Sequence, residues 1–210
     1  MDEAAAKQWL AAQDVPRGTI DRLIAFVELL TTEAGKQNLL SRSTHHQMWA
    51  RHIVDSAQLT KLGVGSSSGT WIDLGSGAGF PGLVIAMLVD VQIVLVESRR
   101  LRAEWLLRAI EYFELNNATV QHLRVEEVEI SDVAVITARA FAPLPKLLAV
   151  AYRLATPETL WLLPKGRGAA EELASVAATW HGDFTMVPSV TDPASAIIVA
   201  RKVRPRIGRR

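Results

Sequence analysis

The chain has 210 residues, of which 49% are hydrophobic and 21% are charged, and its formal net charge is +1. This length predicts one good-sized domain with its own core, and the absence of cysteine excludes disulfides, thiolate metal ligands and a cysteine nucleophile. The acidic start MDEAAAKQW lacks a signal-peptide pattern, and no uninterrupted apolar run approaches the length of a membrane span. We therefore expect a soluble, cytoplasmic protein without a membrane partner.

The first quarter of the chain predicts helices. After Thr19 the apolar side chains recur at the spacing of one helix face, at Ile20, Leu23, Ile24, Val27 and Leu30. Thr19 or Asp21 is the expected cap of this helix. A second helix is predicted from Thr44, with Gln47 completing a capping box, toward Leu62. The following segment, KLGVGSSSGT, is a linker by composition, so we divide the chain into a helical extension (1–64) and a larger domain (65–210).

Strands and helices alternate after this linker. The predicted strands cover 71–74, 91–96, 118–123, 133–137 and 160–163, and the predicted helices follow Pro81 or cover 101–113, 143–154 and 169–178. Two closing strands, at 184–187 and 196–200, are joined by the turn TDPAS. This alternation predicts an α/β fold in which helices cover both faces of a mostly parallel sheet.

Basic residues gather at the end of the chain. The last eleven residues, ARKVRPRIGRR, contain six Lys and Arg side chains and no acid. Such a segment is most often a solvated end, and its obvious use would be nonspecific attraction to phosphate. The near-zero net charge of the whole chain argues against a general nucleic-acid binder.

The most informative segment is the glycine turn, residues 73–82 with the sequence DLGSGAGFPG, which joins the first predicted strand to a helix. Glycine at every second position, Gly75, Gly77 and Gly79, lets the backbone turn sharply and approach a ligand closely. The turn also lies at the carboxyl edge of the predicted sheet, where α/β proteins bind ligands. We therefore expect a cofactor at this turn.

Two cofactor classes fit the glycine turn. Gly77-Ala-Gly79-Phe-Pro-Gly82, with Glu97 20 residues after Gly77, satisfies the dinucleotide fingerprint and predicts a nucleotide-dependent oxidoreductase. The frame Asp73-x-Gly75-x-Gly77-x-Gly79 instead resembles the first motif of S-adenosylmethionine-dependent methyltransferases, in which an acid at this place manages the ammonium group of the ligand. Glu97 fits both classes, because a carboxylate there can accept hydrogen bonds from ribose hydroxyls. Too little chain follows Glu97 for the second half of a dinucleotide site, so we favour the methyltransferase.

Several further motifs occur in a fixed order between Gln37 and Gly168. They are Asn38-Leu39, Arg51-His52-x-x-Asp55-Ser56, Glu97-Ser98, Arg124-Val125-Glu126-Glu127, Arg139-Ala140-Phe141 and Pro164-Lys165-Gly166. Together with the glycine turn they resemble the bacterial 16S ribosomal RNA guanine-N7 methyltransferases, also called glucose-inhibited division protein B. The chain departs from the family pattern at Glu33-Ala34, at Leu40 and at Ala138, and these departures concern substrate contacts more than cofactor binding.

The resemblance implies a class I, Rossmann-like S-adenosylmethionine-dependent methyltransferase that acts on 16S ribosomal RNA of the small ribosomal subunit. It implies cofactor contacts from Gly75 and Phe80, an adenine site bordered by Val125 and Glu126, and a place for Arg139 where donor and acceptor meet. The expected cofactor-binding residues are Asp73, Gly75, Gly77, Gly79, Phe80, Glu97, Val125, Glu126 and Arg139.

Arg139 and Lys165 are the expected catalytic residues. Each follows a predicted strand at the ligand edge, and an arginine beside a core is costly without an acid or a ligand as partner. N7 of guanine has an in-plane lone pair and needs no general base before it attacks a methyl sulfonium. We therefore expect these cations to align guanine O6 or nearby phosphates rather than to exchange protons.

The expected RNA-binding residues are Asn38, Arg51, His52 and Lys165. For Arg51 and His52, support of the cofactor loop is an equally weighted alternative. His46 and His52 are six residues apart, a spacing that does not place two metal ligands on one helix face, and we expect no metal site. We also expect a monomer. A non-catalytic RNA-binding module that assists ribosome assembly remains as a third function.

Overall fold

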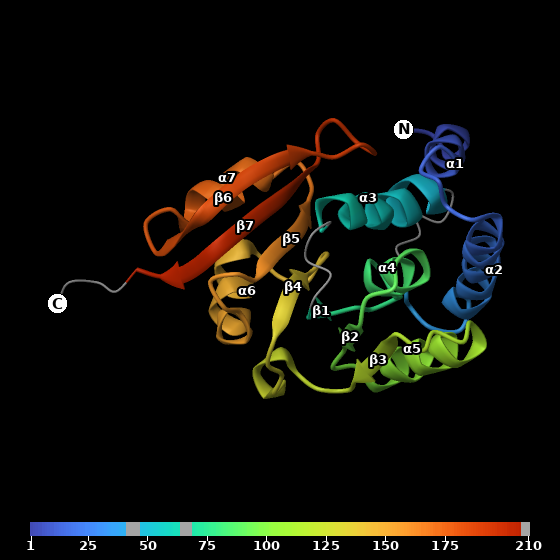
Figure 1. Cartoon of the computed structure of the whole chain (residues 1–210), viewed down its shortest axis with the longest axis horizontal. Helices are drawn as coiled ribbons and strands as arrows, with labels where there is room; N and C mark the ends of the chain where they lie inside the picture. Colours follow the sequence, from blue (N-terminus) through green and yellow to red (C-terminus); the bar gives the residue numbers. More distant parts are fainter. Residues whose placement is uncertain (41–46, 64–68, 207–210) are drawn as a thin grey trace.

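The computed structural model describes residues 1–40, 47–63 and 69–206. Its centre is a seven-stranded sheet with the strand order β3-β2-β1-β4-β5-β7-β6 (Figure 1). The strands are β1 (Thr70–Leu74), β2 (Ile93–Val96), β3 (Ala118–Gln121), β4 (Val133–Thr137), β5 (Leu160–Lys165), β6 (Trp180–Pro188) and β7 (Ala196–Pro205). Strands β1 to β5 pair in parallel. The predicted α/β fold with a mostly parallel sheet is confirmed.

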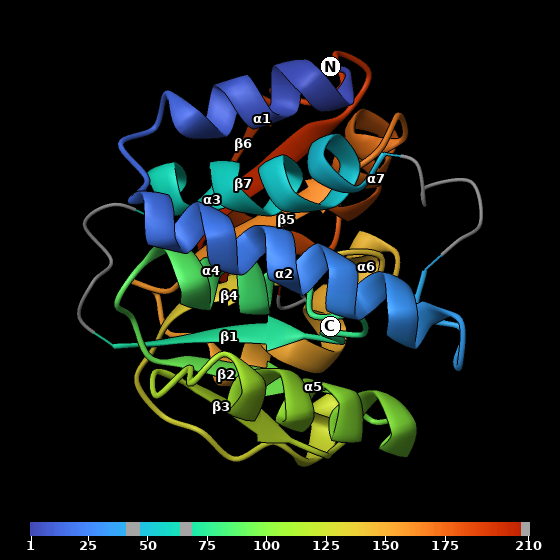
Figure 2. The same ribbon diagram turned by 90° about the vertical axis from the view of Figure 1, so that its right-hand side faces the viewer.

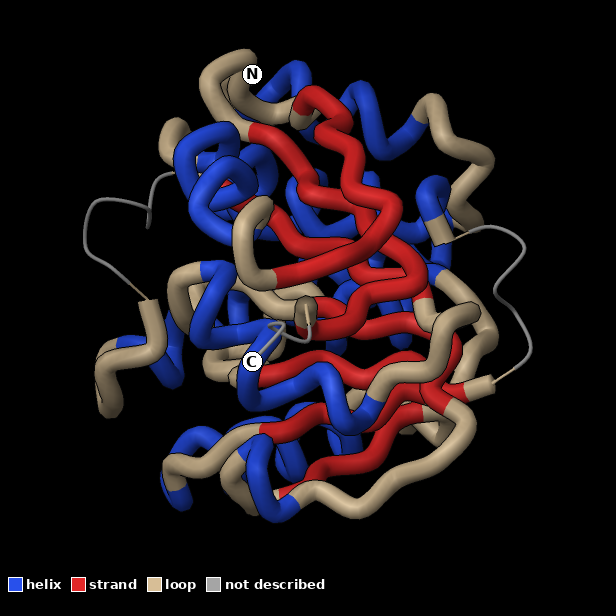
Figure 3. Tube along the Cα trace, turned by 90° about the vertical axis from the view of Figure 1, so that its left-hand side faces the viewer, coloured by secondary structure: helices blue, strands red, loops and turns tan. Residues whose placement is uncertain are grey.

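Helices cover both faces of this sheet. Before it come α1 (Glu3–Ala11), α2 (Arg17–Ala34), the π-helical segment η2 (Trp49–Val54) and α3 (Asp55–Leu62). Between the strands lie α4 (Gly82–Leu88), α5 (Arg100–Tyr112), α6 (Leu144–Ala151) and α7 (Ala169–Val176), with short turns η3 (Val125–Glu127) and η4 (Tyr152–Leu154). Helices α1 to α5 lie on one face (Figure 2), whereas α6 and α7 lie on the other (Figure 3). No helix of the described residues combines the length and apolar character needed to cross a membrane.

Two apolar clusters fill the spaces between the sheet and its helices. Successive strand side chains point to opposite faces, so Trp71 and Leu95 join the cluster under α4 and α5, while Ile72 and Val96 join the cluster under α6 and α7. Because both faces are covered, strand β1 is buried from Trp71 to Leu74. This double burial explains the continuous apolar runs of the parallel strands.

The helical extension shares its core with the rest of the molecule. Leu10, Phe26 and Ile53 belong to the same buried cluster as Leu83 of α4. The side chain of Glu3 also accepts hydrogen bonds from the first two backbone N–H groups of η2, at 3.0 and 2.9 Å. The boundary predicted near residue 64 thus marks a change in the type of element, while the packing continues across it.

One helix start differs from the prediction. Helix α2 begins at Arg17 after Pro16, which has a φ of −55°, and no side chain caps it. Thr19 and Asp21 lie inside the helix, so the prediction that either one caps it was wrong. Pro16 occupies the cap position itself, and its side chain has no oxygen that could accept a hydrogen bond from the first turn. The other predicted cap, Thr44, lies outside the described residues.

The closing hairpin is longer than predicted and has a defined direction. Most β6 side chains are exposed or half-buried, which is why its apolar pattern predicted only residues 184–187. Strand β7 is antiparallel to both β5 and β6, so β6 runs in the direction of the parallel strands. The turn that follows β6, residues 189–195 (the hairpin turn), therefore lies at the carboxyl edge of the sheet, as the glycine turn does.

Candidate functional site

The glycine turn leaves β1 in a conformation that requires glycine. Gly75, Gly77 and Gly79 have φ angles of +71°, +57° and +105°, in the left-handed region that other residues adopt at a cost. The turn is tied to the next strand, because the Gly75 amide donates to the Val96 carbonyl at 2.8 Å. On its far side, the indole of Trp105 donates to the Ala78 carbonyl at 3.0 Å. The backbone path at the sheet edge is thus fixed from both sides.

Two buried acids support the turn from below. Glu97, 4% exposed, accepts hydrogen bonds from the amides of Gly77 at 3.0 Å and Arg99 at 2.8 Å. Asp73, 1% exposed, accepts from the Gly82 amide at 3.1 Å and from the Thr137 hydroxyl at 2.9 Å. Burial raises the pKa of Asp73 to about 6, although these hydrogen bonds oppose the shift. Asp73 therefore lies beneath the turn, outside the cavity walls described next.

A cavity of about 740 Å³ opens beside the glycine turn. Its walls come from several parts of the chain: the extension with Leu39, Leu40, Arg51 and His52; the glycine turn; Arg102 of α5; residues 139–143 after β4; and residues 164–166 at the end of β5, with Glu172 of α7 and the hairpin turn. This is the crevice at the carboxyl edge, between β1 and β4, where the strand order changes direction. Its volume is typical of a small-molecule site.

A second cavity, of about 320 Å³, continues from the first. Its walls include Val96, Ser98, Val125 and Glu126, and it shares Gly75, Phe141 and Ala142 with the larger cavity. Phe141 packs so closely on the turn that a Cβ atom at Gly75 would lie 2.6 Å from the Phe141 ring. The expected adenine-site residues Val125 and Glu126 thus lie together, behind Phe141.

Arg139 reaches the larger cavity from the end of β4. Its guanidinium donates to the Arg51 carbonyl and contacts His52 Nδ1, both at 2.9 Å, and it lies 3.8 Å from a carboxylate oxygen of Asp55. It also lies over the Phe80 ring, 5.0 Å from the ring centre. Burial lowers the pKa of this arginine, and Asp55 and Asp73 oppose the shift. A guanidinium has five N–H donors, more than these contacts use, so donors remain for a ligand.

The motif Arg51-His52-x-x-Asp55-Ser56 lies where η2 meets α3. The ring of His52 stacks on Phe80 with the centres 4.8 Å apart, and the Ser56 hydroxyl donates to the His52 carbonyl at 2.6 Å. Arg51 forms an ion pair with Asp192 of the hairpin turn at 3.1 Å. His52 is 8% exposed, so its contacts favour the alternative that it supports the cofactor loop. The half-exposed Arg51 side chain remains at the cavity rim.

Lys165 lines the larger cavity but has partners within the chain. Its ammonium group donates to Glu172 at 2.7 Å and to the Ala142 carbonyl at 3.1 Å. The same Glu172 oxygen accepts from the Leu144 amide at 2.7 Å. These contacts hold the segment after β4 in place, so the structure favours a supporting role for Lys165 over the predicted catalytic one.

The remaining predicted residue, Asn38, lies at the edge of the site. Its side chain is exposed, and its backbone carbonyl accepts a hydrogen bond from the Arg102 guanidinium at 3.0 Å. Arg102 itself lines the cavity. Among the described residues, no group of three or more His, Asp or Glu side chains is placed to hold a metal ion; His45 and His46 lie outside these residues.

Sequence reasoning missed several residues of the site. Asp55 was visible inside a motif, but nothing in the sequence connected it with Arg139. Ser189 and Thr191 of the hairpin turn line the cavity and contact Asp55, although more than 130 residues separate them from it along the chain. A contact of this range leaves no local pattern, whereas the glycine turn does.

Comparisons with known proteins show the family of this chain. A family model described as rRNA small subunit methyltransferase G (GidB) matches residues 19–195. A relative named ribosomal RNA small subunit methyltransferase G, from Novosphingobium aromaticivorans, is 52% identical over 202 residues, covering 95% of this chain and 88% of the relative. The chain belongs to this family. A relative of the same name from Rhizorhabdus wittichii is 50% identical and covers 98% of this chain and 95% of its own.

Solved structures with the same fold are more distant in sequence. An O-methyltransferase from Bacillus cereus, in complex with SAH, matches with a TM-score of 0.62 and 14% identity, covering 94% of this chain and 97% of its own. A variant of MtNAS in complex with S-adenosylmethionine matches with a TM-score of 0.58 and 14% identity, covering 96% and 84%. The predicted family, the class I fold and the S-adenosylmethionine-dependent methyltransferase class are confirmed. The oxidoreductase alternative is excluded by family membership.

Proposed function

We propose that this chain transfers the methyl group of S-adenosylmethionine to N7 of a guanine in 16S ribosomal RNA of the small subunit. One observation carries the choice of acceptor atom. The two carboxylates on the walls of the larger cavity, Asp55 and Glu172, are both engaged: Asp55 with Gln58 and Thr191, and Glu172 with Lys165. The described histidine on these walls, His52, contacts Arg139 through Nδ1. Walls whose described carboxylates and histidine already have partners support an acceptor that needs no deprotonation, and N7 of guanine is such an atom.

The residues at the carboxyl edge fit the cofactor. The glycine turn presents backbone without Cβ atoms, at Gly75 and Gly77, to the larger cavity. Glu97 directly follows β2, between Val96 and Ser98, which line the smaller cavity, and it has lone pairs beyond the two that its hydrogen bonds use. The smaller cavity offers apolar walls from Val96 and Val125 for a flat ring. When bound, S-adenosylmethionine supplies an electrophilic methyl group on a sulfonium. We propose that Glu97 binds the ribose hydroxyls and that Gly75, Gly77, Gly79 and Phe80 shape the wall beside it.

Arg139 orients the acceptor in this proposal. Its guanidinium is held by η2 and by Phe80, and its remaining N–H groups donate to guanine O6 or to a neighbouring phosphate. A hydrogen bond to O6 leaves the adjacent N7 free to attack, and a fixed donor supplies alignment rather than proton transfer. Asp73 and Lys165 act indirectly, because one supports the glycine turn and the other supports the segment that carries Arg139 and Phe141.

The RNA meets the site at the rim of the larger cavity. We propose that Arg51, Arg102 and Asn38 contact its backbone there. The cationic Arg51 and Arg102 line this cavity, and the exposed Asn38 precedes Leu39, which also lines it. The basic end of the chain adds attraction that weakens with salt. We further propose that the chain acts as a monomer in the cytoplasm, where its ribosomal substrate lies.

The test is methyl transfer to small ribosomal subunits from a strain that lacks this activity. Purified protein is incubated with labelled S-adenosylmethionine, and the product is mapped by reduction and aniline cleavage, which break RNA at N7-methylguanosine. We expect one new cleavage in the 16S RNA with the wild type and none with Arg139→Ala. Label without cleavage would show that another atom is the acceptor. Cofactor binding without label would leave a non-catalytic RNA-binding module as the function.

A further inference from the structure

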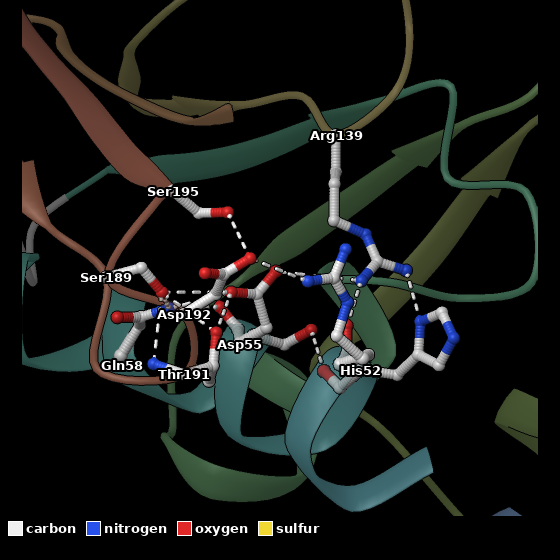
Figure 4. Close-up of polar contacts among 10 residues, drawn as sticks. His52, Asp55, Gln58, Arg139, Ser189, Thr191, Asp192 and Ser195 are labelled. Carbon is white, nitrogen blue, oxygen red and sulfur yellow. Dashed lines mark hydrogen bonds and ion pairs between the residues drawn. The ribbon is translucent and has the colours of Figure 1, made fainter. Parts of the chain in front are cut away.

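The carboxylate of Asp55 lies between Arg139 and the hairpin turn (Figure 4). One oxygen, Oδ2, lies 3.8 Å from Arg139 Nη1. The other, Oδ1, accepts from the Thr191 hydroxyl at 3.0 Å and from Gln58 Nε2 at 2.9 Å, and Ser189 Oγ lies 3.4 Å away. The side chains of Asp55 and Arg139 are only 18% and 19% exposed. The hairpin turn thus contacts the guanidinium site through this carboxylate, in addition to the ion pair between Asp192 and Arg51.

The hydrogen bonds on Oδ1 fix the rotation of this carboxylate. A carboxylate has two equivalent oxygens, and one that is bound on one side only can turn about its bond to Cβ. Thr191 and Ser189 are 5% and 9% exposed, and their hydroxyls also contact each other at 2.9 Å. With Oδ1 held by this shielded group, Oδ2 stays toward Arg139. The charge that attracts the guanidinium therefore has a fixed place.

We propose that Asp55 is a positioning residue, which holds the guanidinium of Arg139 in its working orientation because Thr191 of the hairpin turn fixes the Asp55 carboxylate. The inference rests on the proposed role of Arg139 in orienting the acceptor. A misplacement of about 1 Å at a reacting centre can lower the rate about 100-fold. A weaker hold on Arg139 thus lowers the turnover rate while substrate binding persists.

A purely structural role makes a different prediction. If the network only fastens the hairpin to α3, its loss lowers stability, as does the loss of any buried hydrogen bond, and the rate constant of the folded enzyme is unchanged. Thr159 is the matched control for this case. It is 1% exposed, its hydroxyl donates to the Val133 carbonyl at 2.7 Å, and it lies at the start of β5, at the opposite edge of the sheet.

The experiment compares Thr191→Val, Thr191→Ser and Thr159→Val in the full chain. We expect Thr191→Val to lower kcat about tenfold, while KM for small subunits and the affinity for S-adenosylmethionine stay within about twofold. Thr191→Ser keeps the hydroxyl and is expected to restore the wild-type kcat. Thr159→Val is expected to unfold at lower urea concentration with an unchanged kcat. An unchanged kcat in Thr191→Val, or an equal loss in Thr159→Val, would overturn the proposal.

A second readout does not depend on methyl transfer. In protein labelled with 15N-arginine, the Nε–H signal of Arg139 is assigned from its loss in Arg139→Ala. We expect Thr191→Val to shift or broaden this signal and Thr159→Val to leave it unchanged. A signal that Thr191→Val does not alter contradicts the hold through Asp55. If the wild type transfers no methyl group, the proposed function fails, and the NMR comparison still decides whether Asp55 positions Arg139.

Discussion

Asp73 gives a stability prediction whose size follows from its surroundings. Its side chain is 1% exposed, and burial raises its pKa from 3.8 to about 6, against the opposing hydrogen bonds of Ser76, Thr137 and Gly82. The carboxylate is therefore more costly to ionise in the folded chain than in the unfolded chain. At about 1.4 kcal/mol for each pKa unit, this difference destabilises the fold by about 3 kcal/mol once the group is fully ionised.

The sign of the pH dependence follows from the direction of the shift. Because the pKa of Asp73 is raised in the folded chain, the stability due to its protonated form is fully present below pH 3.8 and is lost as the pH rises through about 6. Of the roughly 3 kcal/mol of stability that ionisation of Asp73 removes, about 2 kcal/mol is lost between about pH 4.5 and about pH 7.5. The wild type should therefore gain less stability on approaching neutral pH than a variant without this charge.

Asp73→Asn removes the charge and can keep the hydrogen bonds with Gly82 and Thr137. The amide oxygen can accept from the Gly82 N–H, and the amide nitrogen can donate to the Thr137 oxygen. The Thr137 hydroxyl can then turn its proton toward the Ile72 carbonyl, 3.4 Å away. Asparagine thus fits the same place without the cost of a buried charge.

Urea unfolding of the wild type and Asp73→Asn at pH 4.5 to 7.5 measures the effect. From pH 4.5 to 7.5, we expect the free energy of unfolding of Asp73→Asn to rise by about 2 kcal/mol relative to that of the wild type. Asp90→Asn, at an exposed position, controls for the loss of one negative charge from the chain. A difference that stays constant, or that changes in favour of the wild type, would refute the reasoning, because it would show that the fold stabilises the Asp73 carboxylate.

Three further substitutions test the supports of the site. Gly77→Val is expected to abolish S-adenosylmethionine binding in calorimetry, because a β-branched residue does not readily adopt a φ of +57° and its side chain would block the approach of the ligand. The control Gly18→Val, at a position on α2 with open space around it, is expected to bind the cofactor normally. Glu3→Ala is expected to lower the free energy of unfolding by about 1 to 2 kcal/mol in urea, because it removes the side-chain cap of η2. Trp105→Phe keeps most of the ring packing but removes the hydrogen bond to the Ala78 carbonyl of the glycine turn. We expect its affinity for S-adenosylmethionine to be several-fold weaker, and an unchanged affinity would contradict the role of Trp105 in fixing the turn.

The parts of the site that the sequence predicted are those built from adjacent residues. A left-handed turn requires glycine at each of its positions, so Gly75, Gly77 and Gly79 appear as a local pattern. Buried parallel strands require continuous apolar runs, and β4 was predicted with its observed ends, Val133 and Thr137. In both cases the physical requirement acts within a few residues of the chain.

The roles of the polar side chains could not be predicted in the same way. An acid at the end of a strand is equally consistent with binding a ligand and with supporting the backbone below it. For Asp73 the contacts of the described residues favour the second role, because the Gly82 amide and the Thr137 hydroxyl lie within reach of its two oxygens. Lys165 is a similar case, since Glu172 reaches it from α7. The position of a polar residue after a predicted strand indicates that it lies at the sheet edge. The role of its side chain there depends on neighbours that are distant in the sequence.

The direction of a single strand determines whether Thr191 can reach Asp55. The sequence predicted two closing strands but not that β7 would lie between β5 and β6, antiparallel to both. If β6 ran against the parallel strands, its turn would lie at the opposite edge, far from η2 and Arg139. The observed order instead brings the hairpin turn to the edge where β1 and β4 end. The positioning of Arg139 through Asp55 is therefore a property of the whole sheet, and substitutions that shift the register of β6 on β7 should impair it without changing any residue of the site.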